Sequence, residues 1–142
     1  MRLTKFAAAF LVTSIAYLSP AGAEGLLDEK AQGNVRYVTG GIGADAVAAF
    51  KAAAPKYPLE LLFAQKASPN DVYLADVQVT VKGATGQTVL DAVSGGPFLL
   101  AQLPPGKYRI EANSGGVMKQ QTVEVKSGQH QRVVFVWEAG EG

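Results

Sequence analysis

Few side chains in this sequence of 142 residues could carry chemistry, and they lie far apart. His130 is the only histidine and there is no cysteine, which leaves no histidine- or thiolate-based metal cluster and no convincing Ser–His relay. We expect His130 to be a solvated loop residue whose replacement by alanine barely changes stability. Asp71 and Asp76 flank a turn, but the acidic spacing of a calcium loop is missing. The sequence therefore predicts no catalytic residue, no metal site and no cofactor.

One glycine-rich motif resembles a nucleotide-binding fingerprint. Gly41–Ala46 reads G-x-G-x-x-A between a short strand and a helix, and Glu60 lies 17 residues beyond Gly43. Glu60 falls inside its strand, however, and no second strand–helix–strand unit follows. We interpret the motif as a tight glycine turn that opens a helix, with anion binding at the helix N-terminus as the alternative.

Hydropathy patterns predict the elements around these residues. A short strand at Val35–Val38 is followed by one apolar helix face, spaced by 3, 4 and 3 residues: Val47, Phe50, Ala54 and Tyr57. Beyond Ala67, strands recur every 8–12 residues with glycine or proline between them, which is typical of a β-sandwich or barrel. The sequence therefore predicts a mainly β protein with one N-terminal helix.

Two of the predicted strands are apolar on both faces. Val133–Trp137 does not alternate, and Phe98–Ala101 is similarly two-sided. A strand of this kind is usually covered on both faces. We expect the helix to cover the outer face of Val133–Trp137, and an exposed patch that binds a partner is the alternative.

Five aromatic residues raise the possibility of a sugar-stacking platform: Tyr37, Tyr73, Phe98, Tyr108 and Trp137. Tyr108 is in phase with a core face, and Trp137 ends an apolar strand. Tyr37 and Tyr73 are the candidates for exposure. Packing in or around the core is our interpretation, and a small carbohydrate-binding module is the alternative.

A turn motif near the middle of the predicted sandwich carries a family resemblance. The motif is Leu103-Pro104-Pro105-Gly106-Lys107-Tyr108-Arg109-Ile110. Leu103 fills the core, the Pro-Pro-Gly turn needs no backbone N–H for strand pairing, and Tyr108 and Ile110 return to the core. With Ala75–Val79 and Ser94–Phe98, it makes the chain from about Asp76 to Trp137 resemble the carboxypeptidase regulatory-like family. The resemblance implies a transthyretin-like or immunoglobulin-like β-sandwich of about seven strands and says almost nothing about activity.

The N-terminus has the three-part plan of a secretory signal peptide. Met1–Lys5 is basic, Phe6–Leu18 is apolar, and Pro20–Ala23 ends in small residues, which predicts cleavage between Ala23 and Glu24. The apolar run of 13 residues is short for a membrane span of about 20, and an uncleaved anchor is the alternative. Without Arg2 and Lys5 the chain has 11 basic and 12 acidic residues, a balance that argues against nucleic acid.

These features predict a periplasmic or secreted protein with a signal peptide at 1–23 and a flexible leader at 24–34. Residues 35–142 form one domain, in which a strand–helix–strand extension (35–66) packs on the sandwich (70–137). We expect a non-catalytic binding or accessory domain, with another exported or envelope protein as its partner and no membrane anchor after cleavage. A transthyretin-like hydrolase is disfavoured, because such enzymes use several histidines. The ligand, the partner and the oligomeric state stay open.

Overall fold

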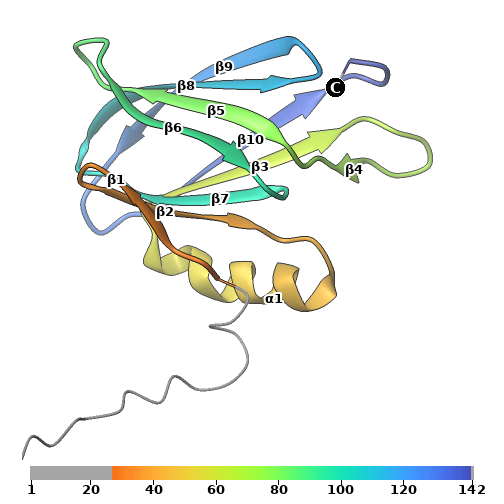
Figure 1. Cartoon of the computed structure of the whole chain (residues 1–142), viewed down its shortest axis with the longest axis horizontal. Coiled ribbons are helices and arrows are strands. Elements are labelled where there is room, and N and C mark those ends of the chain that lie inside the picture. Colours follow the sequence, from red (N-terminus) through yellow and green to blue (C-terminus); the bar gives the residue numbers. More distant parts are fainter. Residues whose placement is uncertain (1–26, 142) are drawn as a thin grey trace, which may run out of the picture.

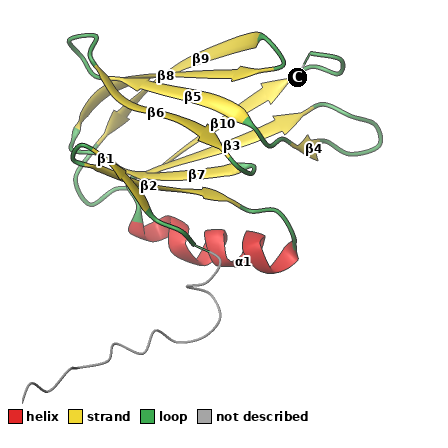
Figure 2. Cartoon of the chain, in the orientation of Figure 1, coloured by secondary structure: helices red, strands yellow, loops and turns green. Residues whose placement is uncertain are grey.

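The computed structural model describes residues 27–141, so the expected signal peptide and its Ala23–Glu24 cleavage site lie outside the described residues. In chain order the elements are β1 (Lys30–Gln32), β2 (Val35–Gly40), α1 (Ala44–Ala53), a 3₁₀ turn η2 (Ala54–Lys56), β3 (Leu59–Gln65), β4 (Val72–Tyr73), β5 (Val77–Lys82), β6 (Thr88–Ser94), β7 (Phe98–Gln102), β8 (Gly106–Ser114), β9 (Val117–Val125) and β10 (Gln131–Trp137). Figure 2 shows one helix lying beneath a stack of strands. No helix in the described part of the chain is long and apolar enough to cross a membrane.

The strands form two sheets that face each other (Figure 1). Sheet A has the order β1-β2-β7-β3-β10, with β4 paired to the end of β3. Sheet B has the order β6-β5-β8-β9 and is antiparallel throughout. The predicted β-sandwich is therefore confirmed. The N-terminal extension does more than pack on it, because β3 lies within sheet A, antiparallel to β7 and parallel to β10.

The main core fills the space between the two sheets. On β5 the alternating residues Val77, Val79 and Val81 are fully buried, while Gln78 between them is exposed. This is the period of two that a strand with one solvated face requires. Sheet A contributes large side chains to the same core, including Phe63, Phe135 and Trp137.

A second core lies between the outer face of sheet A and helix α1. Phe50 is fully buried and stacks on Phe98, with ring centroids 5.8 Å apart. The helix covers outer-facing residues of three adjacent strands, namely Val38 on β2, Leu62 on β3 and Leu100 on β7. Every residue of Phe98–Ala101 is consequently buried, as expected for a two-sided strand.

The expectation that α1 covers Val133–Trp137 is wrong. Strand β10 is the edge strand beyond β3 in sheet A, and its outward-facing Val134 is 38% exposed. Val133, Phe135 and Trp137 point into the main core and are buried. The strand therefore alternates in burial although its sequence does not alternate in hydropathy.

The assignment of residues 24–34 to a flexible leader is also wrong for its last part. Lys30–Gln32 forms β1, antiparallel to β2. Leu27 packs against the second core, and the hydroxyl of Tyr57 donates to Glu29 Oε2 over 2.5 Å. Burial, together with this acceptor and its negative charge, raises the pKa of Tyr57 to about 12. These contacts fasten the segment beside α1.

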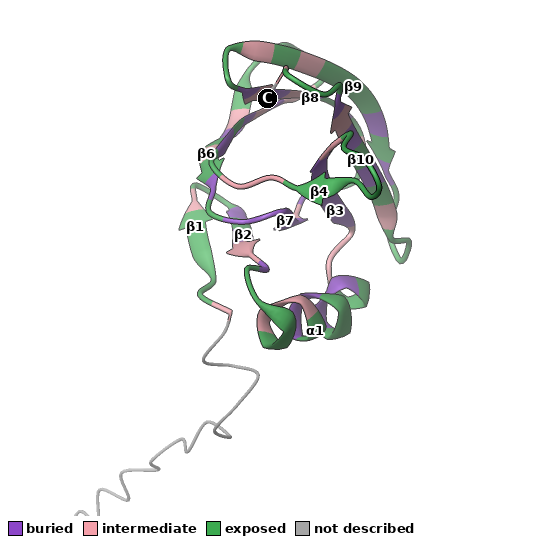
Figure 3. Cartoon of the chain, turned by 90° about the vertical axis from the view of Figure 1, so that its right-hand side faces the viewer, coloured by how far each residue is buried: buried purple, intermediate pink, exposed green. Residues whose placement is uncertain are grey.

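Strands of both sheets run between two ends of the molecule, where the connections gather (Figure 1). We call one end the proline end; it consists of the connections 33–34, 54–58, 83–87, 103–105 and 126–130. The opposite end is the glycine end; it consists of the connections 41–43, 66–71, 74–76, 95–97, 115–116 and the C-terminal turn 138–141, together with the short strand β4. Figure 3 looks onto the glycine end, with β4 in front.

Candidate functional site

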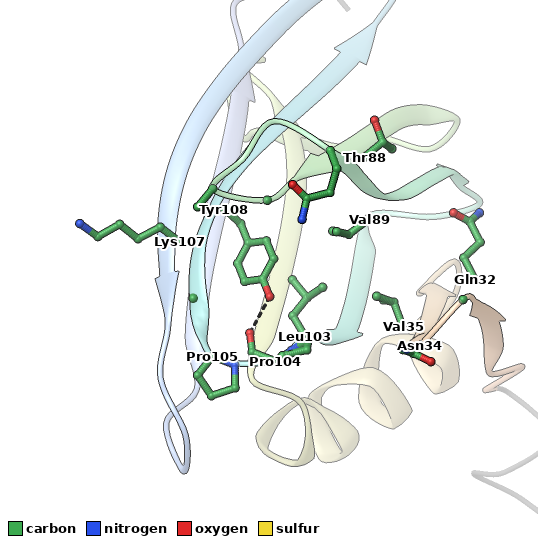
Figure 4. Close-up of a pocket in the computed structure, with 15 residues that line it drawn as sticks. Gln32, Asn34, Val35, Thr88, Val89, Leu103, Pro104, Pro105, Lys107 and Tyr108 are labelled. Carbon is green, nitrogen blue, oxygen red and sulfur yellow. Dashed lines mark hydrogen bonds between the residues drawn. The ribbon is translucent and has the colours of Figure 1, made fainter.

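A hollow with a volume of about 710 Å³ opens at the proline end (Figure 4). Its walls are the β1–β2 turn, the β5–β6 turn and the β7–β8 turn. Its floor is apolar and includes Val35, Val89, Leu103 and the ring of Tyr108. The volume falls in the range of small-molecule and side-chain pockets, about 300–1,000 Å³.

The Leu103–Ile110 motif builds one wall of this hollow. Gly106 has a φ of 159°, close to extended backbone, and the chain enters β8 there directly after the two prolines. Tyr108 points into the hollow, and its hydroxyl donates to the Pro104 carbonyl oxygen over 2.6 Å (Figure 4). Burial raises the pKa of Tyr108. The phenol thus braces the turn, in keeping with the predicted return of Tyr108 to the core.

A glutamine closes the opposite wall. The side-chain amide of Gln32 donates to the Asp91 carbonyl oxygen over 2.5 Å and accepts from the Asp91 N–H over 2.9 Å. This pair of bonds imitates a strand neighbour and joins β1 of sheet A to the edge of β6 in sheet B. Sequence reasoning missed this contact, because residues 59 positions apart carry no local pattern that connects them.

The titratable side chains that line the hollow are Lys107 and Tyr108. Figure 4 shows the Lys107 side chain directed away from the hollow. No carboxylate or histidine lines it, so its lining holds neither an acid–base pair nor a nucleophile beside a base. The arrangement has the apolar floor and polar rim of a binding surface.

A second hollow of about 330 Å³ lies on the other side of the same turn. It shares Leu103 and Pro105 with the first and adds residues of η2 and of the β9–β10 connection. Lys56 and Lys126 are its charged lining residues. The two hollows flank the Leu103–Pro105 turn, which stands between them as a ridge.

His130 is not the free loop residue that the sequence suggested. Its Nδ1 lies 2.8 Å from the Tyr57 carbonyl oxygen, and its Nε2 lies 2.8 Å from Glu60 Oε1. Glu60 is only 6% exposed, and the next cation is Arg132, whose Nε is 3.9 Å from the same carboxylate oxygen. The histidine therefore ties the β9–β10 connection to the chain after η2 and to the start of strand β3. Its signal in the sequence was a single acidic residue inside an apolar strand, which needs a partner once buried.

The remaining candidates fall apart spatially. Asp71 pairs with Lys66 across 3.8 Å at the surface, and Asp76 occupies a left-handed turn with φ of 59°. Among the described residues no three metal-ligating side chains converge. Gly43 begins α1 without a side-chain cap, as the glycine-turn interpretation of Gly41–Ala46 requires.

The expected exposure of Tyr37 is wrong, whereas that of Tyr73 is confirmed. Tyr37 is 8% exposed, because it lies on the core face of β2, and Tyr73 is 55% exposed. The other three aromatic candidates are buried: Phe98, Tyr108 and Trp137. The five residues therefore do not form one exposed platform for a sugar ring.

Fold and site together define a β-sandwich module with hollows at one end. Residues 64–137, just over half of the 142, match the model of the Rhizobiales growth-associated tandem repeat domain, and the chain belongs to this family. The matching family is thus a different one from the carboxypeptidase regulatory-like family that the Leu103–Ile110 motif resembles. The general β-sandwich expectation stands.

Two solved structures show partial similarity. The minor pilin GBS52 of Streptococcus agalactiae has a TM-score of 0.44 at 18% identity, over 56% of this chain and 43% of that chain. The Bacillus anthracis TIE protein has a TM-score of 0.35 at 16% identity, over 57% of this chain and 16% of that chain. These likenesses carry no argument about function. No curated protein matches the chain.

Proposed function

We propose that the chain is an exported, non-catalytic β-sandwich module that binds another protein of the cell envelope through its proline end. The observation that carries this proposal is the 710 Å³ hollow, which has an apolar floor and a lining without carboxylate or histidine. Pockets of this make-up accept an apolar group and orient it through a few polar contacts.

Two further observations support an exported binding module. The first 23 residues have the plan of a signal peptide, which predicts that the chain is released into the periplasm or secreted. The family is described as a growth-associated tandem repeat domain. In a tandem repeat, a domain lies next to another copy of the same fold, so such a copy is one kind of binding partner. Repeat modules generally offer surfaces for binding.

Site-specific photo-crosslinking in growing cells tests the proposal. A photoreactive side chain is placed at Asn34, on the rim of the large hollow, and in a second strain at Asn70, an exposed residue of the glycine end. We expect a protein adduct from position 34 that weakens when the labelled chain also carries Ala84→Trp, which fills the hollow. Fractionation of the same cells should place the adduct in the envelope.

The matched control is Ala48→Trp in the labelled chain, which makes the same change on the exposed face of α1, away from the hollow, and should leave the adduct unchanged. Absence of any adduct at position 34 would overturn the proposal. Equal adduct yields from both tryptophan variants would also overturn it, because the hollow would then play no part.

A further inference from the structure

Charges are segregated between the two ends of the module. The two hollows of the proline end are lined by Lys56, Lys107 and Lys126 and by no carboxylate. All three lysines are exposed. Glu124 lies opposite Lys107 in the β8–β9 ladder, and Glu29 accepts a hydrogen bond from Tyr57 beside the second hollow. This end is therefore basic although the chain as a whole is close to neutral.

The glycine end has the opposite sign. Five acidic residues lie on its connections or at the first turn of α1: Asp45, Asp71, Asp76, Glu138 and Glu141. Two lysines partly offset them, since Lys66 lies 3.8 Å from Asp71 and Lys119 lies 3.6 Å from Glu141. The remaining carboxylates give this end an acidic surface.

Apolar side chains project from the acidic glycine end, whereas the basic proline end is hollowed. Ile42 is 69% exposed, Tyr73 is 55% exposed and Val72 is 46% exposed. The buried ring of Phe98 lies beside two of these positions. A Cβ at Gly41, next to Ile42, would lie 2.4 Å from Phe98 Cδ2, and the Tyr73 ring centroid is 6.1 Å from that of Phe98. Figure 3 shows β4 standing out at the front of this end. The protruding groups are thus held on a packed base.

We propose that the occupant of the proline end is the glycine end of a second copy of this chain, so that copies associate head to tail. This inference rests on the proposed function and names its partner. Protruding apolar groups flanked by carboxylates complement a hollowed apolar surface flanked by exposed lysines. Such a contact joins two different surfaces and does not close on itself, so copies add in an open row.

Charge reversal at each end gives a specific test. Lys56→Glu with Lys126→Glu makes both ends of the module acidic, and Asp71→Lys with Glu138→Lys makes both ends basic. Each double variant should self-associate at least tenfold more weakly than the unaltered chain in sedimentation equilibrium, and an equimolar mixture of the two should associate again. The control is Lys30→Glu with Arg36→Glu, which reverses the same charge on the flank formed by β1 and β2. It should change association by less than about twofold.

Salt provides an independent measurement. Association of the unaltered chain should weaken steeply toward about 1 M salt, where charges are screened beyond about 3 Å. Circular dichroism and thermal unfolding establish that each variant is folded before its association is interpreted.

Two results would overturn the inference: an unaltered chain that stays monomeric up to about 1 mM, the weak end of measurable binding, or a mixture that associates no better than its components. If position 34 still captures a different envelope protein, the proposed function survives and only the partner is wrong. If position 34 captures nothing, both proposals fail.

Discussion

Replacement of His130 by alanine should destabilise the protein by about 2 kcal/mol. The ring bridges two oxygen acceptors at 2.8 Å each, the Tyr57 carbonyl and the buried Glu60 carboxylate. Both contacts are satisfied when Nδ1 donates to the carbonyl and a proton lies between Nε2 and the carboxylate. Alanine removes both contacts and leaves the carboxylate of Glu60, a residue that is 6% exposed, beside Arg132 at 3.9 Å.

The magnitude follows from the type of contact and from its exposure. A hydrogen bond to a charged group contributes about 1.5–3 kcal/mol, and a broken buried ion pair costs about 3–5 kcal/mol. The His130 side chain is 31% exposed, so water reaches the vacated position and lowers the cost toward the smaller range. Arg132→Ala should cost less than about 1 kcal/mol, because that side chain is 55% exposed and its contact is long.

A double-mutant cycle measured by urea unfolding checks this reasoning. Glu60→Gln keeps the shape of the side chain but removes the charge, so His130→Ala in that background should cost less than about 1 kcal/mol. The coupling energy should be about 1–2 kcal/mol. If His130→Ala changes stability by less than about 0.5 kcal/mol in the unaltered background, the original expectation of a solvated histidine is right and the bridge contributes nothing.

Three further predictions concern the second core, the glycine end and the N-terminus. Phe50→Asp should lower the free energy of unfolding by about 3 kcal/mol or more, because Phe50 is fully buried between α1 and sheet A. The control Ala48→Asp, on the exposed face of α1, should cost less than about 1 kcal/mol. Equal midpoints of urea unfolding for the two variants would refute this assignment of the helix faces. Gly96→Ala should destabilise more than Gly86→Ala in thermal unfolding, since a Cβ at Gly96 would lie 2.3 Å from the Gly40 carbonyl oxygen and a Cβ at Gly86 would meet nothing within 4 Å. Gly86→Ala should still cost about 1 kcal/mol, because its φ is 87°, and the reverse order would contradict the close approach. The intact mass of the exported protein should correspond to a chain beginning at Glu24, and a full-length membrane-bound species would contradict release.

Local sequence patterns determined the helix and the longer strands. The valines at 77, 79 and 81 alternate with polar residues, and this period requires a strand with one buried face. The spacing of Val47, Phe50 and Ala54 required a helix, and Pro55 placed its end where α1 gives way to η2. The Leu103–Ile110 motif predicted its own turn, because two prolines and a glycine restrict the backbone conformations available there without help from distant residues. These features depend on residues that are neighbours in the chain.

Sheet order decided what those patterns left open. Phe98–Ala101 and Val133–Trp137 are both continuous apolar runs, but β7 lies at the centre of sheet A under the helix and β10 lies at its edge. The Gln32–Asp91 bridge and the His130–Glu60 bridge join residues 59 and 70 positions apart. Hydropathy records that a side chain prefers burial and not which distant strand buries it. Composition and periodicity by themselves thus determined the helix, the longer strands and the sandwich class. Strand β1, the helix's position, the two side-chain bridges and the hollows at the proline end arise only from long-range packing.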